Sequence, residues 1–533
     1  MLRKYRYLII LIVISSSILL FRLGDMALTD PDETFYAQTA KEMVAADEWT
    51  TPLIFGEPQF EKPIFYYWLI IISYKMFGIN EFAARFPSVL FGIMGVIGIF
   101  FMGRLMFSER CGFISGLILA TCVEYVVVSR GCVTDIVLTT AILLCLLFFL
   151  LGWTRTKTGY YLIAAVFAAI AVLTKGPIGL FIPVVIISSF ILTVRDWRAV
   201  RKIPFFRCVF LFLIIAMPWY IIVTRMHGEA FLGEFFGFHN IVRFLEPEHR
   251  IGTSPWFYIP VVMGGFFPWS FFLPVGFWIM IREPKDASET KGYRAFLLAW
   301  FISIFLFFSI SRTKLVTYIL PLFPVMAIIV GRLWDKFLSG GQGSGALEKK
   351  IKISHFALTI SSILMSVGVS LFVKQRYPEA FMGTVISAAV FMSGTIIAFI
   401  MLLKGKKIKA LYVGAASVVV IIVPLTLYVL PVLEEFESSK AVSYKVKELA
   451  LPSEAIGGES DTRRGIAFYT DRINIEDIHS YADMKEFFSR KERVWGIVKR
   501  KHYEQYRREK VKEVSDPLYQ VGKKVVVTNR VKP

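Results

Sequence analysis

The sequence predicts a polytopic α-helical membrane protein with a small α/β domain after its last span. Three observations lead to this fold class. Hydrophobic residues make up 56% of the 533 positions and charged residues only 19%, whereas a soluble domain carries about 25% charged residues. Many apolar stretches reach the roughly 20 residues that a helix needs to cross a bilayer. The composition becomes mixed and charged after residue 431. A disordered or coiled-coil chain is excluded, and a cytosolic enzyme is disfavoured.

About thirteen apolar stretches are long enough to span a bilayer. The first, residues 7–23, follows a basic start without a small-x-small cleavage site, so we expect a retained anchor rather than a removed signal peptide. Residues 64–77 are apolar but short, which predicts a helix in the interface or packed on the bundle. The expected spans begin near Tyr7, Phe86, Gly112, Val133, Tyr160, Gly176, Phe205, Trp256, Ala295, Lys314, Ile353, Phe381 and Ala410.

The distribution of basic residues predicts the orientation in the membrane. Alternate connections are rich in Lys and Arg, most clearly residues 195–207, which hold five basic residues against the single acidic Asp196. Such connections are typically cytoplasmic. We therefore expect a cytoplasmic N-terminus and, with an odd number of spans, an extracytoplasmic tail. The net charge of +19 is interpreted as a topology signal, and no nucleic-acid partner is expected.

Two domains are predicted on this basis. Residues 1–431 form the transmembrane domain, in which residues 24–85 are the first extracytoplasmic loop. Residues 432–533 form an extracytoplasmic α/β domain, because residues 493–498 and 524–528 have strand patterns and residues 481–490 have a helical one. About 100 residues are enough for such a domain to fold alone, with a modest core.

Carboxylates gather at the expected outer ends of the spans. Asp32 and Glu33 precede a helical pattern, where acidic residues favourably face the helix dipole. The alternative is a catalytic carboxylate that deprotonates or orients an acceptor. Asp135 begins a later span, and an ionisable residue at the bilayer border is a functional candidate by default. Arg130 is its nearest partner in sequence, so an ion pair that fixes two helix ends is the competing interpretation.

Cations that could bind an anionic phosphate lie at the same face. They are Lys62, Lys175, Arg312 and Lys314, with the phenol of Tyr318 nearby. The structural alternatives are a solvated Glu61–Lys62 pair, a capped turn at Lys175, and snorkelling of Arg312 and Lys314 to the interface. Residues 224–255 add several histidines, among them His249, without the compact spacing of zinc proteases or fingers. Any metal site would have to be assembled from distant segments.

Together these residues indicate a site for a lipid-borne anion. The lipid tail would lie among the helices, its phosphate would meet Lys and Arg, and a carboxylate would face the incoming acceptor. The sequence has neither a Walker phosphate loop nor a Rossmann glycine fingerprint, so no nucleotide cofactor is expected.

Several motifs resemble the bacterial aminoarabinose transferases, which modify lipid A and belong with the protein O-mannosyltransferases in the GT-C superfamily. The matching pieces occur in order over about the first 330 residues. They are PDETFYA at 31–37, FEKPIFYYW at 60–68, Asp135, TKGP at 174–177, FHN at 238–240, Arg243–Phe244, His249–Arg250, PWS at 268–270 and KLVTYILP at 314–321.

The resemblance implies a GT-C-like bundle and a polyprenyl-phosphate-linked sugar donor, with inverting transfer on the outer side of the inner membrane. Asp32, with Glu33 beside it, becomes the leading catalytic carboxylate, and Asp135 would line the same cavity. Lys62 and Tyr318 would contact the donor phosphate, with Lys175, Arg312 and Lys314 as further cations. Glu61 and His249 would form a zinc pair. The acceptor would be lipid A, another glycan or a protein.

The chain departs from the family pattern at two positions. Phe35 stands where the aminoarabinose enzymes often have Arg, and Gln59 stands where an aromatic residue is common. These changes leave the sugar and the acceptor open. The alternatives are a protein O-mannosyltransferase-like enzyme or, in a different class, a transporter or flippase of lipid-linked saccharides. Transporters tend to place binding residues near the midplane between related halves. Here the charges gather at one face.

Overall fold

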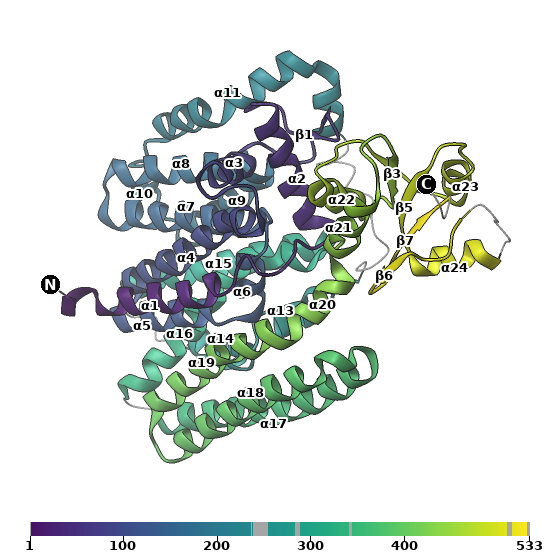
Figure 1. The fold of residues 1–533 in the computed structure, drawn as a ribbon. Helices are drawn as coiled ribbons and strands as arrows, with labels where there is room; N and C mark the ends of the chain where they lie inside the picture. The colour runs from purple at the N-terminus through teal and green to yellow at the C-terminus, as the bar shows by residue number, and fades with distance from the viewer. Residues whose placement is uncertain are drawn as a thin grey trace.

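The computed structural model describes residues 2–235, 237, 254–282, 288–340, 344–508 and 514–529. It shows a helical bundle with a small α/β domain at one end, while the N-terminus lies at the opposite end (Figure 1). The predicted fold class is thereby confirmed, including the α/β domain near the C-terminus.

The apolar segments correspond one to one with the predicted spans. In the described part of the chain, nine helices are long and apolar enough to cross a membrane, two bent helix pairs pass the same test, and two shorter helices are also apolar. The helices of the bundle are α1 (Leu2–Leu20), α4 (Glu81–Met106), α5 (Glu109–Ala120), α6 (Val123–Arg130), α7 (Asp135–Arg155), α8 (Thr158–Lys175), α9 (Ile178–Val194), α10 (Trp197–Val200), α11 (Phe205–Phe231), α13 (Tyr258–Gly265), η2 (Trp269–Phe272), α14 (Leu273–Arg282), α15 (Ser288–Ile310), η3 (Val316–Leu322), α16 (Phe323–Ser339), α17 (Ser344–Arg376), η4 (Pro378–Ala380), α18 (Phe381–Leu403), α19 (Lys407–Pro424), η5 (Leu425–Val429) and α20 (Leu430–Glu437).

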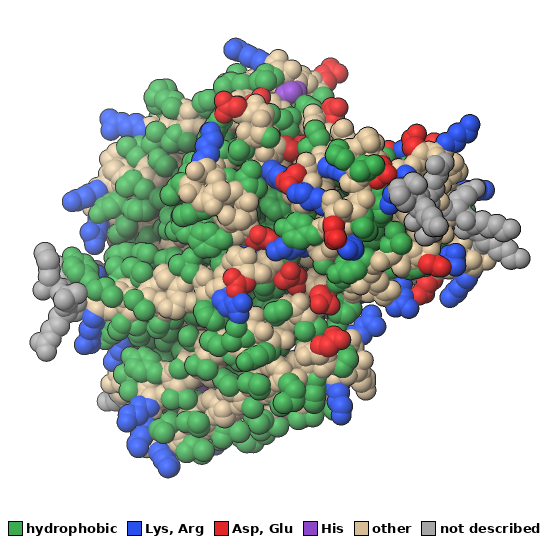
Figure 2. All heavy atoms as spheres, in the orientation of Figure 1, with side chains coloured by type: hydrophobic (Ala, Val, Ile, Leu, Met, Phe, Trp, Pro, Cys, Tyr) green, Lys and Arg blue, Asp and Glu red, His purple; other side chains and the backbone are tan. Residues whose placement is uncertain are grey.

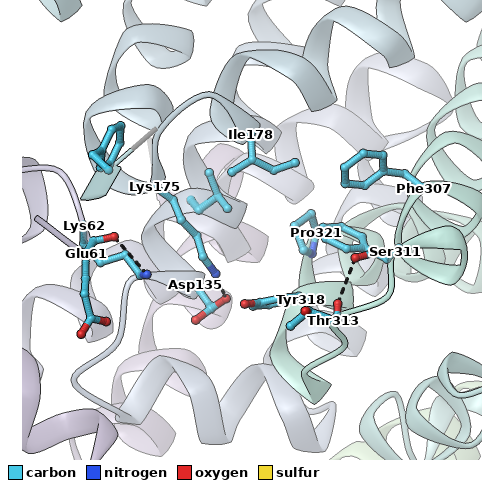
Figure 3. Close-up of a pocket in the computed structure, with 13 residues that line it drawn as sticks. Glu61, Lys62, Asp135, Lys175, Ile178, Phe307, Ser311, Thr313, Tyr318 and Pro321 are labelled. Atoms are coloured by element: carbon cyan, nitrogen blue, oxygen red, sulfur yellow. Dashed lines mark hydrogen bonds and ion pairs between the residues drawn. The ribbon is translucent and has the colours of Figure 1, made fainter. Parts of the chain in front are cut away.

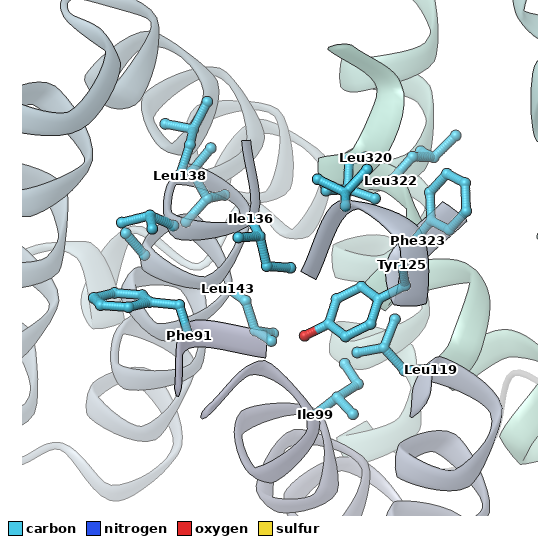
Figure 4. Close-up of a cluster of buried hydrophobic side chains, with 14 of the residues drawn as sticks. Phe91, Ile99, Leu119, Tyr125, Ile136, Leu138, Leu143, Leu320, Leu322 and Phe323 are labelled. Carbon is cyan, nitrogen blue, oxygen red and sulfur yellow. The ribbon is translucent and has the colours of Figure 1, made fainter. Parts of the chain in front are cut away.

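The helices around α4, α5 and α7 form the buried centre of the bundle. Figure 4 shows aliphatic and aromatic side chains from these helices and from α6 beside those of η3 and the first residue of α16. Helices α4 and α5 approach closely at Gly103, where an added Cβ would come within 2.8 Å of the Cα of Gly112. Inside lipid, the burial of apolar surface drives helix association only weakly, so membrane helices depend on close van der Waals packing. Small residues such as these glycines allow the two backbones to approach closely.

The first loop is structured. It contains α2 (Asp32–Ala45), the short hairpin of β1 (Leu53–Ile54) and β2 (Glu57–Pro58), and α3 (Phe65–Phe77). Helix α3 packs on α2 and α4, as predicted for the apolar segment at residues 64–77. The loop therefore forms a cover over one end of the bundle.

The C-terminal domain is a five-stranded sheet in the order β4-β3-β5-β7-β6. Strand β3 (Ala455–Gly458) runs parallel to β4 (Ile475–Asp477) and β5 (Val494–Lys499), while β7 (Lys524–Thr528) is antiparallel to β5 and to β6 (Tyr519–Val521). The helices are α21 (Lys440–Leu449), α22 (Arg463–Thr470), α23 (Tyr481–Phe488) and α24 (Arg500–Arg508).

Side chains of β5 and β7 alternate between the two faces of this sheet. Val498 and Val525 pack with α23 and α24 on one face, whereas Trp495 and Val526 pack with α21 and α22 on the other. This two-residue period is what separates two cores across one sheet. The two strands predicted from the sequence are β5 and β7.

The C-terminal domain docks on the first loop through α21 and α22. Lys440 contacts Glu81 at 2.7 Å, and Lys41 contacts Asp471 at 2.6 Å. The hydroxyl of Tyr469 accepts a hydrogen bond from the backbone N–H of Leu28 at 2.8 Å. In Figure 2, Lys and Arg dominate the end of the bundle that carries the N-terminus, whereas Asp and Glu lie toward the docked domain.

Candidate active site

A cavity of about 140 Å³ lies at the end of the bundle beneath the first loop. Its charged and polar lining comes from four separate segments, and its remaining wall is apolar (Figure 3). The lining residues are Glu61, Lys62, Asp135, Leu138, Lys175, Ile178, Phe235, Phe307, Phe308, Ser311, Thr313, Tyr318 and Pro321. Five of the residues predicted from the sequence thus meet in one cavity: Glu61, Lys62, Asp135, Lys175 and Tyr318.

Asp135 and Lys175 form an ion pair across the cavity wall. The Nζ of Lys175 lies 2.6 Å from Oδ1 of Asp135 and 4.7 Å from the centroid of the Tyr318 ring. The side chain of Lys175 is 15% exposed and that of Asp135 is 14% exposed. Asp135 starts α7 and Lys175 ends α8, and a turn joins these consecutive helices at their other ends, so both charges lie at the same end of the helix pair. The partner of Asp135 is therefore Lys175, whereas Arg130 donates to the carbonyls of Ile18 and Phe21.

Glu61 and Lys62 approach the same cavity from the first loop. The Nζ of Lys62 donates to the backbone carbonyl of Glu61 at 3.2 Å. The carboxylate of Glu61 lies 3.4 Å from the guanidinium of Arg464, which comes from α22 of the C-terminal domain. The same guanidinium lies 4.6 Å from the ring centroid of Phe35. A cation from the C-terminal domain therefore stands beside the carboxylate that lines the cavity.

Glu33 is buried within the first loop, on α2, and does not line the cavity. Its carboxylate accepts two hydrogen bonds from Arg85 at 2.7 Å, and it also accepts from the backbone N–H groups of Thr29 and Cys132. Burial opposes ionisation, but the charge of Arg85 and these donors hold the pKa of Glu33 below its usual range. The contacts give Glu33 a structural role, and its expected catalytic role stays a prediction.

Three other predicted residues do not line the cavity. Asp32 is exposed at the first turn of α2, and Arg312 is exposed between α15 and η3. Lys314 is buried, and its Nζ donates to the carbonyl of Ser311. Lys314 thus ties its own loop together instead of snorkelling, and the roles of all three in the reaction stay predictions.

Of the predicted zinc pair, Glu61 and His249, only Glu61 belongs to the described residues. Within the described ranges, no group of three or more His, Cys, Asp or Glu side chains is placed to hold a metal ion. Glu61 faces a cation, Arg464, which is an unfavourable neighbour for a metal ion. The described donors therefore do not make a zinc site by themselves.

Sequence reasoning missed two cations and one carboxylate. In the sequence, Arg85 is only the last residue of the predicted first loop, with no role of its own. Arg464 lies outside the matching motifs. Asp30 belongs to the first loop, and its side chain, which is 5% exposed, faces the C-terminal domain 3.7 Å from the Nζ of Lys524. Burial raises the pKa of Asp30 to about 7, although Lys524 acts in the opposite direction. The partners of all three are far apart in the chain, so no local pattern marks them.

Comparisons with known proteins agree with this architecture. The family of dolichyl-phosphate-mannose-protein mannosyltransferases matches residues 61–222. An uncharacterized protein of Aquifex aeolicus is 28% identical over 479 residues, which is 89% of this chain and 88% of the relative. The undecaprenyl phosphate-α-4-amino-4-deoxy-L-arabinose arabinosyl transferase of Edwardsiella ictaluri is 31% identical over 309 residues, which is 57% of this chain. That match spans 55% of the arabinosyl transferase.

A solved structure decides the fold. The crystal structure of ArnT from Cupriavidus metallidurans bound to undecaprenyl phosphate superposes with a TM-score of 0.83 over 99% of this chain and 98% of that one, at 22% identity. The chain has the fold of an aminoarabinose transferase. The resemblance found in the first-loop and span motifs is confirmed, and the superposition extends it to the C-terminal domain, where the sequence showed only a loose likeness.

Proposed function

We propose that this protein is an integral-membrane glycosyltransferase that moves a sugar from a polyprenyl phosphate to lipid A or another cell-envelope acceptor. The observation that carries the proposal is one cavity with two chemically different sides. Lys62 and Lys175 provide positive charge, while Phe307, Phe308 and Ile178 provide an apolar wall. A prenyl phosphate needs both kinds of surface. The names of the similar arabinosyl transferases support the same donor class.

The cavity suits a reaction in which a phosphate leaves as an anion. The bond between the anomeric carbon and the phosphate oxygen breaks, and a bond from an acceptor oxygen to that carbon forms. Positive groups fixed where charge develops stabilise such a transition state, because they need no reorganisation. We assign this role to Lys175, because its ammonium lies in the cavity lining, beside Asp135 and the ring of Tyr318.

Asp135 is the carboxylate that could assist the acceptor. In the structure it neutralises Lys175. A bound donor phosphate would take over that cation, and the released carboxylate could accept the proton of an incoming hydroxyl. If the acceptor is already an ionised phosphate, it carries no such proton, and Asp135 would then orient the sugar. Asp32 keeps its predicted role as a group that contacts the acceptor, because it is exposed on the outer side of the first loop.

The proposed location is the inner membrane of a bacterium, with a cytoplasmic N-terminus and the cavity and C-terminal domain on the outer side. The basic end of the bundle in Figure 2 supports this orientation, because cytoplasmic connections are rich in Lys and Arg. A protease-protection or cysteine-labelling experiment on each terminus measures it directly.

The decisive experiment combines product analysis with a variant in the cavity. Mass spectrometry of lipid A and surface glycans from cells with and without the protein identifies the product. With that donor and acceptor, we expect Lys62→Ala and Asp32→Asn to abolish transfer while the protein still inserts. Lys75→Ala is the matched control, because Lys75 is a half-exposed lysine on α3, outside the cavity lining. Normal transfer by both Lys62→Ala and Asp32→Asn refutes the assignment.

Zinc is tested separately. Elemental analysis of the purified wild type beside His249→Ala measures the metal content. A wild type without zinc ends that prediction and leaves the proposed transfer reaction unchanged.

A further inference from the structure

A second cavity, of about 530 Å³, lies in the C-terminal domain. It opens where the three parallel strands end, and each strand contributes the residues that follow it. Glu459, Ser460 and Asp461 come after β3, His479 and Tyr481 after β4, and Lys499 and His502 from the end of β5. We call this second cavity, which these residues line, the crevice. None of them lies in the region that resembles the glycosyltransferase motifs.

The topology of the sheet explains why a hollow forms here. From the central β3 the chain crosses through α22 to β4 on one side, then through α23 to β5 on the other side of β3. Helix α22 packs in the core on one face of the sheet and α23 in the core on the opposite face. The two connections therefore leave the sheet in opposite directions. Ligands bind in open α/β sheets at such points, outside the carboxyl ends of the strands.

The polar groups of the crevice are held in defined positions. The Nδ1 of His502 donates to Oε1 of Glu459 at 2.8 Å, since an ionised carboxylate only accepts. Glu459 is about one-tenth exposed and also accepts from the backbone N–H of Lys499 at 2.6 Å. On the other rim, Ser460 donates to Asp477 at 2.8 Å and lies 2.9 Å from the Nδ1 of His479. Fixed donors and acceptors of this kind give orientation to a bound ligand.

The crevice also has an aromatic side. The ring of Tyr481 stacks on Tyr506 at 4.6 Å between centroids and 9° between planes. Tyr506 is buried, whereas Tyr481 is 37% exposed, so its ring forms part of the accessible wall. An exposed aromatic face beside carboxylates and imidazoles suits a ring that has apolar C–H faces and a rim of hydroxyl groups.

The charges disfavour the other simple ligands. Lys499 contacts both Asp461 and Glu459, so its positive charge is already neutralised. With Asp477 nearby, the crevice would repel a phosphate. The described residues contain no group of three or more metal-ligating side chains, which disfavours a divalent cation. A neutral or amine-bearing sugar remains, because its hydroxyls both donate to carboxylates and accept from imidazole and ammonium groups.

The crevice is linked to the membrane cavity by a short piece of chain. Asp461 lines the crevice, and Arg464, in the first turn of α22, contacts Glu61 of the membrane cavity. A ligand held at Asp461 is therefore bound by the same segment that reaches the expected donor. The two cavities are thus connected through residues 461–464 of one segment.

We propose that the crevice is a saccharide-binding site that recognises the glycan part of the acceptor. The acceptor role rests on the proposed glycosyltransferase function, whereas the binding of a saccharide does not. The two statements are therefore tested by different readouts.

Saturation-transfer NMR on the full-length protein in detergent measures binding directly. The probes are methyl β-D-glucoside and methyl β-D-glucosaminide, with inorganic phosphate and MgCl₂ as competitors. We expect saturation transfer to at least one glycoside with the wild type. The signal should be lost with Tyr481→Ala and with Asp461→Asn, and kept with Tyr444→Ala. Tyr444 is the matched control, because it is a half-exposed tyrosine on α21 outside the crevice.

The thermal midpoint of each variant separates loss of binding from loss of folding. No saturation transfer to either glycoside, a signal that survives both crevice variants in folded protein, or displacement by phosphate or Mg²⁺ overturns the proposal. The Lys62→Ala variant should bind the glycosides as the wild type does. A protein that binds glycosides through Tyr481 but transfers no sugar would refute the proposed function and leave the crevice assignment standing.

Discussion

Two carboxylate–cation pairs near the first loop differ in how they are enclosed: one is closed off by protein on all sides, and the other is open to a cavity. Glu33 and Arg85 share two hydrogen bonds, and their side chains are 7% and 6% exposed. The remaining donors of Arg85 bind the backbone carbonyls of Leu23, Met26 and Ala27. Asp135 and Lys175 share one contact and border a cavity. A buried charge with every partner supplied holds structure, whereas we expect a pair that faces a cavity to exchange its partner for a ligand.

The largest expected effect comes from breaking the closed pair. Arg85→Ala leaves the carboxylate of Glu33 buried without its cation, and such a change costs about 3–5 kcal/mol. We expect a strongly lowered thermal midpoint, measured by intrinsic fluorescence in detergent. The double variant Arg85→Ala with Glu33→Leu removes both charges and should recover much of that loss. An unchanged midpoint for Arg85→Ala would show that this pair is not structural.

Breaking the open pair should change activity instead. Lys175→Ala removes a cation from the cavity, and the loss of one fixed electrostatic contact slows a reaction by about 100-fold or more. Because Lys175 and Asp135 are partly exposed, the thermal midpoint should change much less than with Arg85→Ala. Transfer rates at saturating donor measure the effect. A Lys175→Ala protein that transfers normally would place the developing charge elsewhere.

A smaller effect is expected from the contact between domains. Arg464 and Glu61 are 28% and 29% exposed, and such ion pairs contribute little to stability, about 0–1 kcal/mol. Because Glu61 lines the cavity, Arg464→Ala should slow transfer by about 3- to 10-fold at a nearly constant midpoint, in line with a coupling of about 1 kcal/mol.

Arg463→Ala is the matched control for this contact. Its guanidinium lies 3.8 Å from the centroid of the Phe55 ring and donates to the carbonyl of Ile475, away from Glu61. Equal slowing by both variants would attribute the effect to loosened docking rather than to the charge beside Glu61.

The last expected effect is a pH dependence at the domain interface, which no substitution is needed to see. Burial raises the pKa of Asp30 from 3.8 to about 7, so the folded protein binds this proton more tightly than the unfolded chain does. Stability from this group is therefore fully present below about pH 3.8 and is lost as the pH rises from there to about 7, by at most about 1.4 kcal/mol per pH unit. The thermal midpoint of the wild type should fall over that interval relative to Asp30→Asn. Parallel curves for the two proteins would contradict the assignment.

The sequence predicted several residues of the cavity because their positions at span ends are local features. Asp135 begins α7 and Lys175 ends α8, so both lie at the same end of the bundle, and the charge pattern of the connections predicted that they share one side. Glu33 was grouped with Asp32 as catalytic because neighbouring carboxylates look alike in sequence. The structure separates them, since Glu33 points inward to Arg85 and Asp32 is exposed.

The sequence by itself determined the membrane class, the positions of the spans, and two strands and a helix of the C-terminal domain. These follow from hydrophobicity and its period within windows of about 20 residues, which the solvent environment dictates. Only the tertiary structure decided that Arg85 closes on Glu33, that Arg464 reaches Glu61, and that three strand ends form a crevice. Such contacts join residues tens to hundreds of positions apart, and their geometry depends on how helices and domains pack.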